Sequence, residues 1–137
     1  MIDSFVVDNS VVMSWCFEDE SNTYTDQILD KLAKSSAIVP SIFPLEVANV
    51  LLVAERRKRI GEANSARFIE LINELPIMVV PEPSGRIMSE IIALAREHQL
   101  SSYDASYLDL AMRKGIPIAT LDKNLLAAAK RIRVKIL

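Results

Sequence analysis

Short apolar runs alternate along the chain with longer segments in which apolar residues recur every three or four positions. The short runs are rich in β-branched residues and are bounded by polar or turn-forming residues, a pattern typical of buried strands. They are residues 5–7, 37–39, 77–80 and 117–121, with 134–137 as a fifth candidate. The pattern therefore predicts four or five strands.

The segments between these runs have the periodicity of amphipathic helices. They include residues 22–34, 44–60, 62–75, 84–98 and the stretch that begins at Ser101. Pro44 favours the first turn of a helix, and Gly115 ahead of Pro117 predicts where the helix after Ser101 ends. A further helix is expected after Asp122.

Strands that alternate with helices predict an α/β fold in three layers, a mostly parallel central sheet of 4–5 strands flanked by helices. The two consecutive helices, 44–60 and 62–75, depart from strict alternation and are expected to pack as a projecting hairpin. A chain of 137 residues suits a single domain, 1–137, with a sizeable core.

Composition narrows the class of protein. One cysteine, Cys16, and one histidine, His98, are too few for a structural zinc site, and both are expected to be structural. No apolar stretch reaches the roughly 20 residues of a membrane-spanning helix, and the N-terminus does not resemble a secretory signal. We therefore expect a cytoplasmic protein with no membrane partner.

The formal net charge of −2 argues against a cationic surface overall. Two basic stretches stand out, residues 56–59 and residues 123–135, which could contact nucleic acid. For the first of them, a solvated helix end whose cations suit the helix dipole is the favoured interpretation. Binding to nucleic acid must therefore rely on local patches or on a metal ion.

Four acidic residues fall at one edge of the predicted sheet. Asp8 and Asp122 end strands, while Glu46 and Asp104 lie in the first turns of helices. In a parallel α/β fold the carboxyl ends of the strands and the amino ends of the helices share one edge, where ligands bind. The four carboxylates are therefore expected to lie near one another.

Each acid alone has another explanation, because an acid at a helix start can cap it or interact with its dipole. Four carboxylates gathered together repel one another unless a cation neutralises them. With no histidine or cysteine nearby, such oxygen ligands suit a hard cation, Mg²⁺ or Mn²⁺. The pattern therefore predicts a metal site made by Asp8, Glu46, Asp104 and Asp122.

Three polar neighbours could orient these carboxylates. Ser10 and Thr120 each stand two residues from an acid of the set, and Asn49 follows Glu46 on the same helix face. Ser10 could equally be a turn residue and Asn49 a surface residue.

Other residues receive structural interpretations. Asp109 points away from Asp104 and stands four residues before Arg113, so it is expected to form an exposed ion pair. Ser101 or Ser102 is expected to cap the helix of Asp104, and residues 18–20 are expected to form a solvated acidic loop.

Four stretches together resemble the PIN-domain ribonucleases, and within them the VapC-type toxins of toxin–antitoxin pairs. They are "VVDNSVVMSWCFEDE", "PLEVANVL", "LSSYDASYLDLA" and "IATLDKNLLAAA", and they span nearly the whole chain. The resemblance implies that Asp8, Glu46 and Asp104 hold the catalytic Mg²⁺ or Mn²⁺, with Asp122 as a fourth, more variable acid. It also implies that Ser10, Asn49 and Thr120 line the site.

The implied activity is metal-dependent endoribonuclease action, in which activated water hydrolyses RNA phosphodiester bonds. Members of the family are usually held inactive by a cognate antitoxin protein and commonly form homodimers. The helices of residues 44–75 could then serve a partner as well as the core, through Leu51, Leu52, Phe68 and Leu71.

Two other interpretations remain open. A PIN-like binding module would keep the fold without the chemistry. A Mg²⁺-dependent phosphotransfer domain also places acids at the carboxyl edge of a parallel sheet, but position 10 is Ser where a dehalogenase-like enzyme needs an acid.

Overall fold

Four parallel strands form the centre of the computed structural model, which describes residues 3–137. Their order in the sheet is β3-β2-β1-β4. The strands are β1 (Ser4–Val7), β2 (Ser36–Pro40), β3 (Ile77–Val80) and β4 (Ile118–Ala119). The predicted α/β fold with a parallel sheet is confirmed. The fifth candidate strand, 134–137, contributes only an isolated bridge between Ile118 and Ile136.

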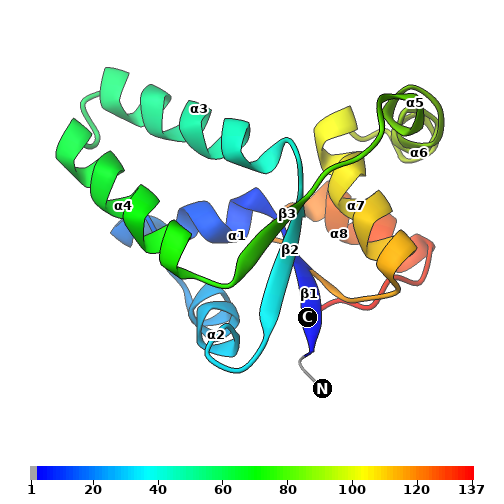
Figure 1. Ribbon diagram of the computed structural model, residues 1–137, viewed down its shortest axis with the longest axis horizontal. Helices are drawn as coiled ribbons and strands as arrows, with labels where there is room; N and C mark the ends of the chain where they lie inside the picture. Colours follow the sequence, from blue (N-terminus) through cyan, green and yellow to red (C-terminus); the bar gives the residue numbers. More distant parts are fainter. Residues whose placement is uncertain (1–2) are drawn as a thin grey trace.

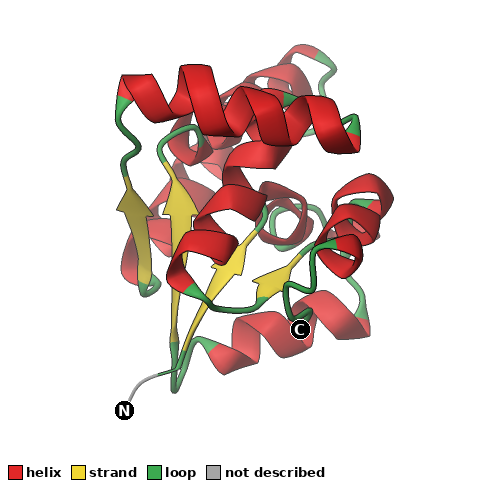
Figure 2. Cartoon of the chain, turned by 90° about the vertical axis from the view of Figure 1, so that its right-hand side faces the viewer, coloured by secondary structure: helices red, strands yellow, loops and turns green. Residues whose placement is uncertain are grey.

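Helices cover both faces of this sheet (Figures 1 and 2). In Figure 1 one layer contains α1 (Asn9–Ser14), α2 (Thr23–Lys31), α3 (Phe43–Arg56) and α4 (Glu62–Glu74). The other layer contains α5 (Ser84–Arg86), α6 (Ile92–His98), α7 (Ser102–Lys114) and α8 (Lys123–Arg131). Because both faces are covered, Val6, Val7 and Val39 are fully buried.

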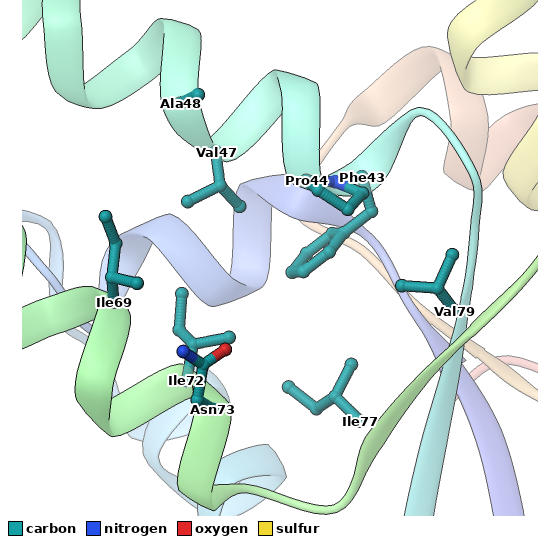
Figure 3. A pocket seen from close by; sticks show the side chains of 9 residues that line it. All are labelled: Phe43, Pro44, Val47, Ala48, Ile69, Ile72, Asn73, Ile77 and Val79. Carbon is teal, nitrogen blue, oxygen red and sulfur yellow. The ribbon is translucent and has the colours of Figure 1, made fainter.

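The helices α3 and α4 form the projecting hairpin that the sequence predicts (Figure 1). Leu51 and Phe68 are buried in the core, whereas Leu52 and Leu71 remain exposed. Between the two helices and β3 lies an apolar hollow of about 290 Å³. Figure 3 shows side chains of all three elements around it, such as Val47 of α3.

The segment predicted as one helix over 84–98 is interrupted. A π-helical turn, η2 (Ile87–Ile91), separates α5 from α6. The periodicity of apolar residues does not reveal the extra residue that such a turn inserts. At the end of α7, Gly115 adopts the left-handed conformation that favours glycine, which confirms the predicted stop.

The prediction that Asp109 lies on the surface is wrong. Asp109 is only 3% exposed, because the 84–98 segment packs over α7 and covers this residue. The predicted ion pair with Arg113 exists, at 2.9 Å, and Arg86 adds a second pair through two hydrogen bonds of 2.7 and 3.1 Å. Asp109 therefore fastens α5 to α7.

The acidic run forms a short 3-10 helix, η1 (Glu18–Glu20), whose residues are exposed as predicted. Asp19 and Glu20 both pair with Arg59, which also lies over the ring of Phe17. Arg59 therefore already has ion-pair partners within the chain.

Among residues 3–137, none of the helices combines the length and apolar character that crossing a bilayer requires.

Candidate active site

Asp8 directly follows β1 at the carboxyl edge of the sheet and is 4% exposed. Its Oδ2 accepts hydrogen bonds from the Ser10 hydroxyl at 2.6 Å and from the Thr120 hydroxyl at 2.8 Å. Burial raises the pKa of Asp8, and the two hydroxyl donors partly oppose this shift by stabilising the charged form. Ser10 and Thr120 therefore hold this carboxylate in place.

The same two hydroxyls connect Asp8 to the start of α8. Thr120 Oγ1 accepts a hydrogen bond from the backbone N–H of Asp122 at 3.0 Å, and Ser10 Oγ accepts one from that of Leu121 at 3.0 Å. Asp122 caps α8, because its Oδ1 accepts from the backbone N–H of Leu125 at 2.9 Å. One carboxylate oxygen of Asp122, Oδ1, is therefore used as the N-cap of α8.

Glu46 lies in the first turn of α3, two residues after Pro44. Its Oε1 accepts a hydrogen bond of 2.6 Å from the hydroxyl of Tyr107, which is fully buried in α7. Burial raises the pKa of Glu46, as do the charges of Asp8 and Asp104, while the Tyr107 hydroxyl lowers it. The pKa of Tyr107 is raised far above its usual range, first by burial and then by Glu46, so this hydroxyl remains a donor.

Asp104 begins α7 without using its carboxylate as the N-cap. That role belongs to Ser101, whose Oγ accepts from the backbone N–H of Asp104 at 3.0 Å, as predicted. The pKa of Asp104 is raised to about 6, mainly by burial and also by the charges of Asp8 and Asp122. The carboxylate of Asp104 is thus destabilised by its surroundings rather than neutralised by a partner.

A hollow of about 460 Å³ extends from Glu46 along α3, and both Asn49 and Tyr103 line it. Asn9 lines it as well, and its buried Oδ1 accepts no hydrogen bond from any residue between 3 and 137. Sequence reasoning missed Asn9 and Tyr107. Their only signal was position, since Asn9 directly follows Asp8 and Tyr107 is three residues after Asp104 on the same helix.

The structure brings the four predicted acids into one electrostatic group. The charge of Asp122 raises the pKa of both Asp8 and Asp104, and the charges of Asp8 and Asp104 raise that of Glu46. Within the described part of the chain, however, no three acidic, histidine or cysteine side chains are gathered closely enough to hold an ion as they stand. The available ligand atoms are all oxygens, which fits a hard cation.

Comparison with known proteins decides the family. The PIN domain model matches residues 5–131. The chain belongs to the PIN-domain family. This result confirms the resemblance seen in the sequence, and the candidate site of this PIN domain lies within the matched residues.

Individual proteins resemble this PIN domain over most of their length. Ribonuclease VapC3 of Pyrobaculum aerophilum is 25% identical over 88% of this chain and 90% of its own. The crystal structure of PAE2754 from Pyrobaculum aerophilum has a TM-score of 0.71 at 24% identity, covering 93% of this chain and 87% of that one. VapBC2 from Rickettsia felis, solved bound to a DNA fragment from its promoter, has a TM-score of 0.67 at 11% identity, covering 98% and 97%. Both structural similarities confirm the fold.

Proposed function

We propose that this protein is a metal-dependent endoribonuclease, the toxin of a toxin–antitoxin pair. The observation that carries the proposal is the group of four carboxylates at the carboxyl edge of a PIN-domain sheet, in which neighbouring acids raise the pKa of Asp8, Glu46 and Asp104. The name of a relative that spans most of the chain, Ribonuclease VapC3, supports RNA as the substrate.

Asp8, Glu46 and Asp104 are the proposed ligands of Mg²⁺ or Mn²⁺, with Asp122 contributing the oxygen that the helix leaves free. When bound, a divalent cation supplies Lewis acidity and offsets the negative charge that develops during phosphodiester hydrolysis. It also allows an acidic site to accept an anionic backbone. This role for the ion agrees with the chain's slightly negative net charge.

The protein's own residues orient the ligands. Ser10 and Thr120 fix Asp8 through its Oδ2, and Tyr107 fixes Glu46 through its Oε1. Donors of this kind keep carboxylates in one orientation and commonly affect metal affinity 10- to 100-fold. Asn49 is proposed to contact substrate, because it lines the hollow that leads away from Glu46.

We further propose that a cognate antitoxin covers the site and that the protein forms homodimers. The apolar hollow between α3 and α4, which the exposed Ile69 and Val79 help to line, offers a surface for apolar side chains of a partner. The VapBC2 assembly of Rickettsia felis supports a protein partner for this fold. We also propose that residues 1–137 are a single PIN domain that acts in the cytoplasm.

The test is cleavage of a circular RNA, which only an endonuclease can open. Purified protein is incubated with the circle in Mg²⁺ or Mn²⁺, and in parallel with EDTA. We expect linear RNA with the metal and intact circles with EDTA. Cleavage that persists in EDTA would contradict the metal mechanism, and intact circles in every condition would favour a binding module.

A further inference from the structure

A second, smaller pocket of about 210 Å³ adjoins the candidate active site. It is lined by residues from four places in the fold, which are the loop after β2, the loop after β3, the π-helical turn η2 and the first two turns of α7. Tyr103 and Ile42 line both this pocket and the hollow that contains Glu46. A group seated in the pocket would therefore lie next to the carboxylate cluster.

Glu82 supplies the charged wall of this pocket, and only one of its two carboxylate oxygens accepts hydrogen bonds from residues 3–137. Its Oε2 accepts hydrogen bonds from the Ser41 hydroxyl at 2.5 Å and from the Ser41 backbone N–H at 3.4 Å. Its Oε1 is buried and receives no donor from residues 3–137. A buried carboxylate oxygen without a donor is costly, so the pocket lacks an N–H or O–H group that a ligand could bring.

The other lining residues suit a flat ring. Ile87 and Ile91, the first and last residues of the π-helical turn, present apolar side chains, and such turns are frequent at functional sites. Tyr103 is 57% exposed, so its ring offers a face on which a base can stack. The pair of Arg86 with Asp109 holds the start of this segment against α7.

We propose that this pocket binds one nucleobase of the RNA substrate, and that the base is guanine. Guanine presents two adjacent N–H donors, and Oε1 of Glu82, which receives no donor from residues 3–137, has two lone pairs to accept them. Adenine, cytosine and uracil each place an acceptor beside their donor, and a carboxylate repels it. The volume is smaller than that of pockets for drug-sized ligands and fits a single base.

This assignment rests on the proposed ribonuclease function, so its first test does not depend on cleavage. Metal-free protein is titrated with 5′-GMP and with 5′-UMP and followed by NMR. We expect 5′-GMP to bind at least fivefold more tightly and to shift the amide signals of Glu82, Ser102 and Tyr103. Glu82→Gln should abolish the preference, whereas Glu97→Gln, which changes an exposed acid of α6, should keep it. Equal affinities, or shifts confined to other regions, would overturn the proposal.

The second test uses RNA oligonucleotides that differ only in the base flanking the cut. The wild-type protein should cleave the guanine-containing RNA fastest, and Glu82→Gln should lower its kcat/KM about tenfold, to the level of the uracil-containing RNA. Cleavage whose base preference is the same with and without Glu82 would overturn the pocket assignment. Selective 5′-GMP binding without any cleavage would instead contradict the ribonuclease function and leave the assignment standing.

Discussion

The hydroxyl of Tyr107 in α7 donates a hydrogen bond of 2.6 Å to Oε1 of Glu46 in α3, a residue 61 positions away in the sequence. Tyr107 is fully buried, so its ring belongs to the core while its hydroxyl faces the candidate metal site. The contact makes the orientation of one proposed ligand depend on how α3 and α7 pack.

Replacing Tyr107 with Phe should keep the ring packing and remove only this donor. We expect Mg²⁺ affinity, measured by calorimetry, to fall about 10-fold or more, because Glu46 loses the group that orients it. Tyr24→Phe is the matched control, since its hydroxyl bonds to the Leu137 carbonyl instead. Unchanged affinity in Tyr107→Phe, or an equal loss in both variants, would contradict the positioning role.

Thr120→Val should change the pH at which the site binds metal. The variant keeps the shape of the side chain but removes a hydrogen bond that stabilises the charged form of Asp8. The pKa of Asp8 should rise further, so Mg²⁺ binding and RNA cleavage should both need a higher pH. A pH profile of cleavage provides the measurement, with the exposed Thr23→Val as control. A profile at the wild-type position would show that Thr120 does not act through Asp8.

Metal-free protein should lose stability as the pH rises. The pKa of Asp104 is about 6 in the folded protein, compared with about 3.9 in an unfolded chain, so the folded state binds the proton more tightly. The stabilisation from this proton is complete below pH 4 and disappears as the pH rises through about 6. We expect a loss of about 1 kcal/mol between pH 4 and pH 7.5, after allowing for solvent screening of a half-buried group. The raised pKa values of Asp8 and Glu46 act in the same direction.

Thermal unfolding at several pH values measures this dependence. Asp104→Asn should reduce it, and saturating Mg²⁺ should oppose it by favouring the charged carboxylates. Stability that increases from pH 4 to pH 7.5 in the absence of metal would contradict the electrostatic description of the site.

Asp109→Asn should destabilise the fold without touching the carboxylate cluster. Burial alone would raise the pKa of Asp109, but hydrogen bonds from Arg86 and Arg113 lower it below its usual value. The variant leaves both guanidinium groups without their anion, at a cost of about 2–3 kcal/mol because they are partly exposed. Denaturant unfolding should show this loss, while the exposed Asp30→Asn should stay within about 0.5 kcal/mol of wild type. A loss that small in Asp109→Asn would mean that the pairs do not fasten α5 to α7.

The positions of the strand-end acids were predictable from sequence. Asp8 and Asp122 follow apolar strands, and parallel strands bring their carboxyl ends to one edge, so local pattern and topology are sufficient. The roles of Ser10 and Thr120 as hydrogen-bond donors to Asp8 follow from the same proximity.

The partners of α7 were not predictable in this way. Asp109 is buried because a distant segment with a π-helical turn packs over it, and Tyr107 meets Glu46 because α3 begins at the carboxyl end of β2. Helical periodicity identifies which residues share a face, but it does not identify what covers that face. Both residues therefore needed the tertiary structure.

The central claim, that the carboxylate cluster is the catalytic site, is tested most directly by one pair of variants. Asp104→Asn and Asp26→Asn each remove one acid from the first turn of a helix, and Asp26 is exposed in α2. Single-turnover cleavage of RNA in Mg²⁺ is measured for both. The account predicts a loss of at least 100-fold for Asp104→Asn and a rate within twofold of wild type for Asp26→Asn. A wild-type rate in Asp104→Asn would contradict it.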